Sequence, residues 1–234
     1  GIEKEFYLTT DEFIHSPSIH RFRDELILLK GSRHFHFERI SELLEKKVHE
    51  TILEVNLSAI VHNFNFYRAK LKPETKMVCM VKAFGYGSGS FELAKTLQEH
   101  RCDYLAVAVA DEGAALRKEG ITIPIIVMNP EFSSFNTLFE YNLEPEVYSF
   151  RLLEALVHET ERRGIIGYPV HVKIDTGMHR LGFQPAEVGK LCVRLKGQSG
   201  VKARSVFSHL AGSDSYVFDD FTHEQLSKFQ RAAA

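Results

Sequence analysis

A single lysine ends an apolar run in the stretch VCMVKAFGYGSG, residues 78–89. The lysine is Lys82, and a glycine-rich loop containing Tyr86 follows it. An amine that loses its hydration has a lowered pKa, and the neutral amine can bond covalently to an aldehyde. Glycines allow a ligand to approach the backbone, and Tyr86 could place its hydroxyl on a phosphate. The competing interpretation is a lysine that simply leaves the core for solvent.

The second stretch, VKIDTGMHRLGF, spans residues 172–183. Lys173 and Asp175 lie on one side of an extended strand, because side chains alternate along it. Arg180 follows a glycine turn, and its planar guanidinium suits a carboxylate. The alternative is an ion network of these three side chains that only orders the loop.

The third stretch, VFSHLAGSD, spans residues 206–214, and in it His209 ends another apolar run. A histidine there could stack on a flat ligand. It could equally be a structural residue held by hydrogen bonds. Elsewhere, His34 and His36 lack a third ligand at a suitable spacing, so we expect no metal site.

A regular alternation of strand and helix patterns positions these three stretches. Six apolar runs typical of strands lie at residues 77–83, 104–110, 123–129, 144–149, 169–177 and 204–211. Six strand–helix units predict an α/β fold with parallel strands and right-handed crossovers. Two architectures fit, an open doubly wound sheet and a (β/α)8 barrel cut after about six units. In both, chemistry gathers at the C-terminal ends of strands, where Lys82, Asp175 and His209 fall and Arg180 follows.

The composition is that of an ordinary soluble globular protein. The 234 residues are 44% hydrophobic with a net charge of −2, which gives no electrostatic reason to expect nucleic acid or a membrane surface. No stretch approaches the roughly 20 apolar residues of a membrane span. The three cysteines are far apart in the sequence, which favours a reducing cytoplasm over a disulfide framework.

Taken together, the three motifs resemble those of alanine racemase. From about Thr51 to Arg231 the chain resembles the N-terminal part of that family's pyridoxal-phosphate-binding (β/α)8 barrel, the fold of type III pyridoxal-phosphate enzymes. The family motif VKANAYGHG stands here as VKAFGYGSG. The resemblance implies that Lys82 is the catalytic lysine that bonds to the cofactor, and that Tyr86 contacts the cofactor phosphate.

The other two motifs carry further implied roles. The family pattern K-x-D-T-G-M-x-R-L-G matches residues 173–182. By this resemblance, Arg180 lies near the cofactor ring and the substrate carboxylate. Lys173 matches a lysine that is often carbamylated and holds that arginine, and Asp175 supports the same motif. The resemblance also implies that His209 packs on the cofactor ring.

Three positions depart from the family pattern. Phe84 and Gly85 stand where asparagine and alanine are usual, and His179 stands where glycine is common. These changes affect the shape of the site without removing a chemical group that the family is known to need.

The first 50 residues resemble a different enzyme. The run ELILLKGSR, with an expected strand at about 26–30, precedes an acidic helical pattern. This resembles the C-terminal end of the Mur ligase that adds D-alanyl-D-alanine to a UDP-muramoyl tripeptide. We therefore expect two parts: a ligase remnant at 1–50 and a partial racemase barrel at 51–234. We assign no ligase activity to the remnant.

The implied activity is the interconversion of L-alanine and D-alanine for peptidoglycan synthesis, in a homodimer. The family's second catalytic base, a tyrosine, and an arginine on the cofactor ring cannot be placed on this sequence. The chain also begins without Met, and we expect it to be a fragment that is inactive alone. Two alternatives remain: a type III enzyme with another reaction, such as a decarboxylase or another amino-acid racemase, and a non-catalytic pyridoxal-phosphate-binding module.

Overall fold

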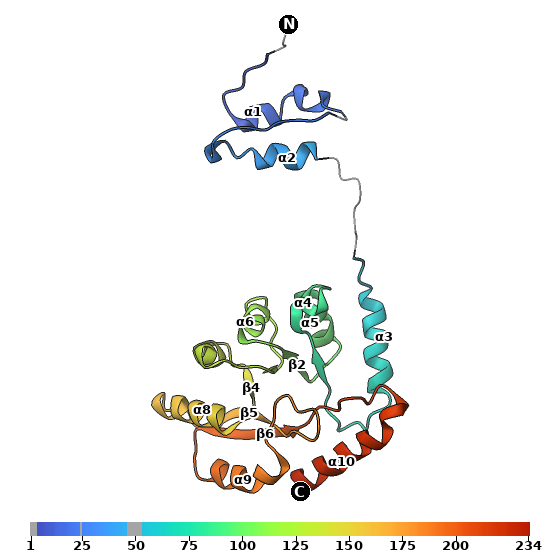
Figure 1. Cartoon of the computed structure of the whole chain (residues 1–234), viewed down its shortest axis with the longest axis vertical. Helices are drawn as coiled ribbons and strands as arrows, with labels where there is room; N and C mark the ends of the chain where they lie inside the picture. Colours follow the sequence, from blue (N-terminus) through green and yellow to red (C-terminus); the bar gives the residue numbers. More distant parts are fainter. Residues whose placement is uncertain (1–3, 24, 46–52) are drawn as a thin grey trace. The chain divides into compact units, whose positions relative to one another are not determined.

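The computed structural model describes residues 4–23, 25–45 and 53–234. The chain forms two compact units, Gly1–Glu54 and Val55–Ala234, which are described separately (Figure 1). None of the described helices is long and apolar enough to cross a membrane.

The first unit consists of short helical segments. They are α1 (Thr10–Ile14), the 3-10 turns η1 (Pro17–Arg21) and η2 (Arg33–Phe35), and α2 (Glu38–Leu44). The expected strand at 26–30 is wrong, because residues 25–32 form no strand. Leu26 and Leu28 are 104% and 86% exposed, and a strand needs a neighbour to complete its hydrogen bonds. The expected helix is present at 38–44, and its continuation through Val48 lies outside the described residues.

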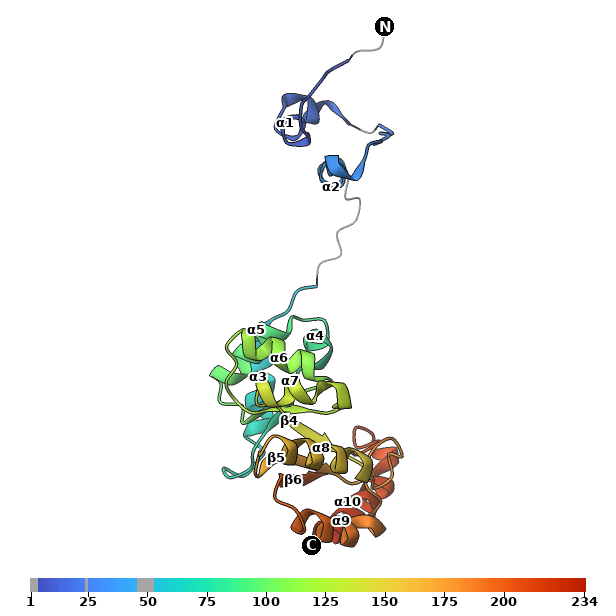
Figure 2. The ribbon, with the colours of Figure 1, turned by 90° about the vertical axis from the view of Figure 1, so that its left-hand side faces the viewer.

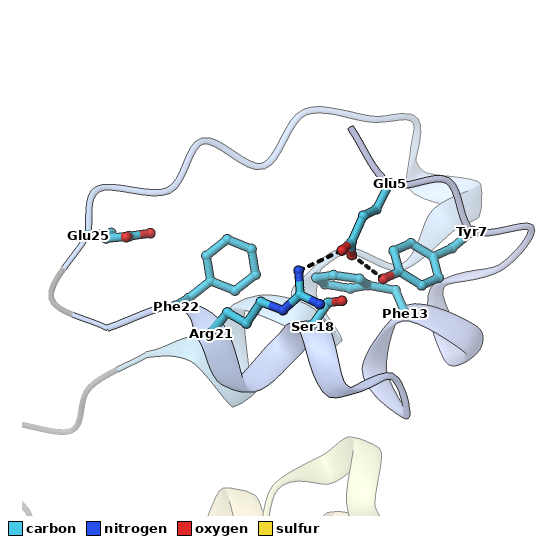
Figure 3. Close-up of a pocket in the computed structure, with 7 residues that line it drawn as sticks. All are labelled: Glu5, Tyr7, Phe13, Ser18, Arg21, Phe22 and Glu25. Carbon is cyan, nitrogen blue, oxygen red and sulfur yellow. Dashed lines mark hydrogen bonds and ion pairs between the residues drawn. The ribbon is translucent and has the colours of Figure 1, made fainter. Parts of the chain in front are cut away.

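A cavity of about 430 Å³ lies within the first unit (Figure 3). Two of its charged groups pair with one another: the Arg21 guanidinium is 2.7 Å from a carboxylate oxygen of Glu5. The Tyr7 hydroxyl donates to the other oxygen of Glu5 at 2.6 Å. These pairings compensate the charges of Glu5 and Arg21, whereas Glu25, which also lines the cavity, forms no ion pair with the described residues.

The second unit is built on a six-stranded parallel sheet in which the strands follow one another in chain order. The strands are β1 (Val78–Met80), β2 (Tyr104–Val107), β3 (Ile125–Val127), β4 (Glu144–Val147), β5 (Tyr168–Lys173) and β6 (Val201–Phe207). The six strands predicted from the sequence are confirmed, although they are shorter and β6 begins three residues earlier than expected. A doubly wound sheet reverses its strand order, whereas this order is that of a barrel cut after six units.

Helices cover the outer side of this sheet, and Figure 1 shows α5, α6, α8 and α9 following one another around the strands. Figure 2 shows α9 and α10 together beyond β6. The helices are α3 (Leu57–Arg68), α4 (Lys82–Tyr86), α5 (Ser90–Glu99), α6 (Ala110–Lys118), α7 (Phe135–Glu140), α8 (Phe150–Arg162), α9 (Val188–Lys196) and α10 (Asp219–Ala233).

The main hydrophobic core lies between the sheet and these helices. Leu105 and Ile125 on the strands are fully buried, as are Leu153 and Leu156 on α8. Alternate side chains of β4 and β5 point away from this core toward the concave side of the sheet, and several of them are charged. This concave side holds the groups discussed next.

Candidate active site

Lys82 lies two residues beyond the end of β1 and opens a turn of unusual handedness. Ala83, Phe84, Gly85 and Tyr86 all have positive φ angles, of 53°, 54°, 65° and 56°. The turn is thus left-handed, a conformation that costs residues other than glycine roughly 1–2 kcal/mol each. Glycine is therefore the favourable residue at position 85. The turn directs the chain sharply away from β1 directly after Lys82.

A carboxylate on a neighbouring helix holds this turn. Glu112 of α6 accepts a hydrogen bond from the Ala83 backbone N–H at 2.6 Å. Its other oxygen accepts from the N–H groups of Ala108 and Val109, at 2.8 and 3.4 Å, just beyond β2. One side chain therefore ties the lysine turn to the end of the adjacent strand. This role was not predictable from the sequence, because Glu112 has the position of an ordinary acid in the first turn of a helix.

Asp175 orders the loop after β5. Its Oδ1 accepts from the backbone N–H groups of Gly177 and His179, both at 3.0 Å. Burial acts to raise the pKa of Asp175, but these hydrogen bonds to the carboxylate more than offset it, and the pKa is lowered. The loop order thus comes from backbone donors, not from the alternative network in which Asp175 pairs with Lys173.

The partner of Lys173 is Glu146, which the sequence analysis did not single out. The Lys173 Nζ lies 3.1 Å from Oε1 of Glu146, and both side chains are buried. A second pair lies nearer the start of the same two strands, where His171 Nε2 is 2.8 Å from Oε2 of Glu144. The sequence does contain a signal for these pairs: the two acids of EPEV alternate within a buried strand, and buried acids need partners that offset the cost of burial.

His209 follows β6, and its backbone is held from α10. Gln225, which is fully buried, donates to the His209 carbonyl at 2.9 Å and to Thr176 Oγ1 at 3.2 Å. Its own carbonyl accepts from the Ala211 N–H at 2.9 Å. Gln225 thus joins the loops after β5 and β6. Gln225 lies within α10, which begins at Asp219.

Positive charges converge on the His209 ring. Partial burial lowers the pKa of His209. The charges of three neighbours lower it further, namely Arg180, Lys173 and Lys82. These residues come from the ends of β1, β5 and β6, as the topology requires for parallel strands. The arrangement favours an anionic ligand.

The structure therefore brings together four of the residues singled out from the sequence: Lys82, Lys173, Arg180 and His209. The side chain of Lys82 is exposed, as in the alternative in which this lysine leaves the core for solvent. Tyr86 is 63% exposed at the end of the left-handed turn. The described residues include no cluster of three metal-ligating side chains.

Comparison with known proteins follows the boundaries of the second unit. Residues 55–234 match the family model described as "Alanine racemase, N-terminal domain". An alanine racemase of Thermodesulfovibrio yellowstonii is 37% identical over 183 residues, which cover 76% of this chain and 48% of that protein. An amino-acid racemase of Enterococcus faecalis is 32% identical over 203 residues, covering 82% of this chain and 27% of that protein.

Solved structures agree with this match. The alanine racemase of Clostridium difficile 630 superimposes with a TM-score of 0.72 at 30% identity, covering 79% of this chain and 50% of that one. The chain thus spans about half the length of most of the relatives it matches.

Proposed function

The chain belongs to the alanine racemase family, and from this premise we propose that its second unit is the cofactor-holding half of a pyridoxal-phosphate-dependent alanine racemase. Enzymes of this family are pyridoxal-phosphate-dependent isomerases. The observation that carries the proposal is that Lys82, Arg180 and His209 all lie just beyond the C-terminal ends of strands of one parallel sheet, namely β1, β5 and β6.

The residues present suit pyridoxal phosphate, which combines an aldehyde, an aromatic ring and an anionic phosphate. Within the described part of the chain, neither Lys82 nor Arg180 has a carboxylate at ion-pair distance. Exposed cations without a counter-charge favour an anion, and an exposed imidazole beside them offers a flat surface. In this proposal Lys82, Tyr86, Arg180 and His209 hold the cofactor.

When bound, the cofactor would provide an aldehyde for the lysine amine and an electron-withdrawing ring that stabilises negative charge on the substrate α-carbon. The Lys82 amine takes a proton from that carbon, or returns it, on one face. Arg180 binds the substrate carboxylate through its planar guanidinium. Asp175 and Gln225 keep the loops that carry Arg180 and His209 in place.

Racemisation needs a second proton-transfer group on the opposite face of the substrate. We propose that residues 55–234 do not supply this group and that racemisation is an activity of the whole protein. Alanine as substrate, a homodimeric assembly and a cytoplasmic location are parts of the same proposal. We expect no racemase activity from the 234-residue chain alone above that of a Lys82→Ala control.

For the first unit, we propose the C-terminal end of a D-alanyl-D-alanine-adding Mur ligase, at residues 1–50. The support is the amino-acid sequence of the run ELILLKGSR and the helix at 38–44, although the strand expected in that run is not formed. The pairing is metabolically coherent, because a racemase would make the D-alanine consumed in peptidoglycan synthesis. The compact unit Gly1–Glu54 is compatible with a separate origin for this part.

The test is an absorbance titration of the purified chain with pyridoxal phosphate. We expect a visible absorbance band, distinct from that of the free cofactor, that is lost in Lys82→Ala. Lys95→Ala is the matched control, because Lys95 is also an exposed lysine, on the adjacent helix α5. Identical spectra for the wild type and Lys82→Ala would contradict the proposal.

A further inference from the structure

His171 of β5 joins an acid and a hydroxyl that the proposed function leaves without a role. Its Nε2 lies 2.8 Å from Oε2 of Glu144 on β4, and its Nδ1 lies 2.7 Å from Oγ of Ser205 on β6. The side chains of His171 and Glu144 are buried, whereas Ser205 is exposed. The three side chains therefore form one hydrogen-bonded chain that runs from a buried acid to an accessible hydroxyl.

An irregularity in β6 directs Ser205 into this chain. The register between β5 and β6 shifts just before His171, which pairs with Ser205, so that Arg204 is an extra residue in β6. The Arg204 Nε donates to the Tyr104 hydroxyl at 3.0 Å, and the Tyr104 ring lies 5.8 Å from that of His171. Arg204 and Ser205 thus reach the same side of the sheet, although consecutive residues of a regular strand point to opposite sides.

The hydrogen bonds of His171 fix the direction in which a proton can move. A carboxylate only accepts hydrogen bonds, so the Nε2–H group donates to Glu144. In the neutral imidazole the other nitrogen is an acceptor, and the Ser205 hydroxyl therefore donates to Nδ1. An imidazole placed in this way can take the proton of a hydroxyl nucleophile while the acid holds the ring. The nearby Arg204 guanidinium favours the negative charge that develops on the oxygen of an attacked carbonyl.

We propose that Ser205 is a nucleophile that cleaves small carboxylic esters, with His171 as its general base and Glu144 as the residue that positions the imidazole. The Ser205 oxygen bonds to the carbonyl carbon of the ester while His171 takes the hydroxyl proton. The bond to the alcohol oxygen then breaks, and the alcohol leaves with that proton while the acyl group stays on Ser205. Water attacks the acyl group in the same way, which releases the acid and restores the serine.

This site is separate from the proposed cofactor site. His171 precedes the last residue of β5, Lys173, by two positions, and so lies toward the start of the strand. Lys82 and His209, in contrast, lie beyond the C-terminal ends of their strands. The ester-cleaving site therefore does not rest on the proposed function, and its test needs no pyridoxal phosphate.

The experiment treats the 234-residue chain with a fluorophosphonate, which forms a bond to the oxygen of a nucleophilic serine and loses fluoride. Mass spectrometry then identifies the modified serine, and p-nitrophenyl acetate is used in parallel to measure ester cleavage. We expect the label on Ser205, and Ser205→Ala should lose both the label and the serine-dependent release of p-nitrophenolate. At equal folded fraction, His171→Gln should slow labelling at least about 100-fold, the smallest factor typical of a general base, and Glu144→Gln should slow it as well.

Ser133→Ala is the matched control. Ser133 is also an exposed serine, and its hydroxyl donates to Glu131 at 3.4 Å without a histidine between them. Its replacement should leave the labelling of Ser205 and the release of p-nitrophenolate unchanged.

Two results would overturn the proposal. One is a folded wild-type chain in which Ser205 is labelled no faster than Ser133, because two equally reactive exposed serines would mean that neither is activated. The other is a folded His171→Gln chain in which Ser205 is labelled at the wild-type rate, because the serine would then react without its base. If His171→Gln fails to fold, the comparison of Ser205 with Ser133 in the wild type still decides.

Discussion

Replacing Glu112 with glutamine should loosen the left-handed turn that follows Lys82. The turn places three residues other than glycine at positive φ, Ala83, Phe84 and Tyr86, at a combined cost of roughly 3–6 kcal/mol. Glu112 offsets part of this cost through its hydrogen bonds to Ala83 and Ala108. Glutamine keeps one acceptor oxygen and turns an N–H group toward a backbone donor. One hydrogen bond to a charged group is therefore lost, worth about 1.5–3 kcal/mol.

The assay combines urea unfolding with the pyridoxal phosphate titration at equal folded fraction. We expect Glu112→Gln to lower the free energy of unfolding by about 1.5–3 kcal/mol and to weaken cofactor binding at Lys82. Asp111→Asn is the control, because it removes a negative charge from the same helix turn and should cost only about 0.3–1 kcal/mol. Equal stability and equal cofactor affinity in the two variants would refute the reasoning.

Three further predictions concern the loops and the buried acid. Gln225→Ala removes the hydrogen bonds that link the loops after β5 and β6. In urea denaturation it should lower the free energy of unfolding by about 2–4 kcal/mol, and it should weaken cofactor binding beside His209. His179→Gly relieves a positive φ of 55° and should leave stability unchanged or raise it by up to about 1 kcal/mol in the same assay; a clear loss would contradict it. Folding raises the pKa of Glu146 from 4.5 to about 7, so the folded chain keeps this proton up to a higher pH than the unfolded chain does. The free energy of unfolding therefore falls as the pH rises from 4.5 to about 7. Relative to Glu146→Gln, the free energy of unfolding of the wild type should fall by about 3 kcal/mol between these two pH values. Parallel plots of unfolding free energy against pH for the two proteins would refute this prediction.

The six strands were predictable because buried parallel strands appear as continuous apolar runs. The clustering of Lys82, Arg180 and His209 then followed from topology, since parallel strands present their C-terminal ends at one edge. The expected strand at 26–30 failed for the converse reason: an apolar run forms a strand only where a neighbouring strand completes its hydrogen bonds.

The partners that hold the site were not predictable from local patterns. Glu112 binds a backbone N–H 29 residues away, and Glu146 meets Lys173 across two strands, 27 residues apart. Such contacts depend on strand register and helix placement, which the local sequence does not specify. The left-handed turn was also missed, because Phe84 and Tyr86 have no intrinsic preference for positive φ.

The most direct test of the account is to identify the lysine to which the cofactor bonds. The chain is incubated with pyridoxal phosphate, reduced with borohydride to fix the pyridoxyl group on nitrogen, digested, and mapped by mass spectrometry. The account predicts that the modification concentrates on the peptide containing Lys82, and that Glu112→Gln reduces it more than Asp111→Asn does. Modification spread evenly over exposed lysines such as Lys95, with no preference for Lys82, would contradict the central claim.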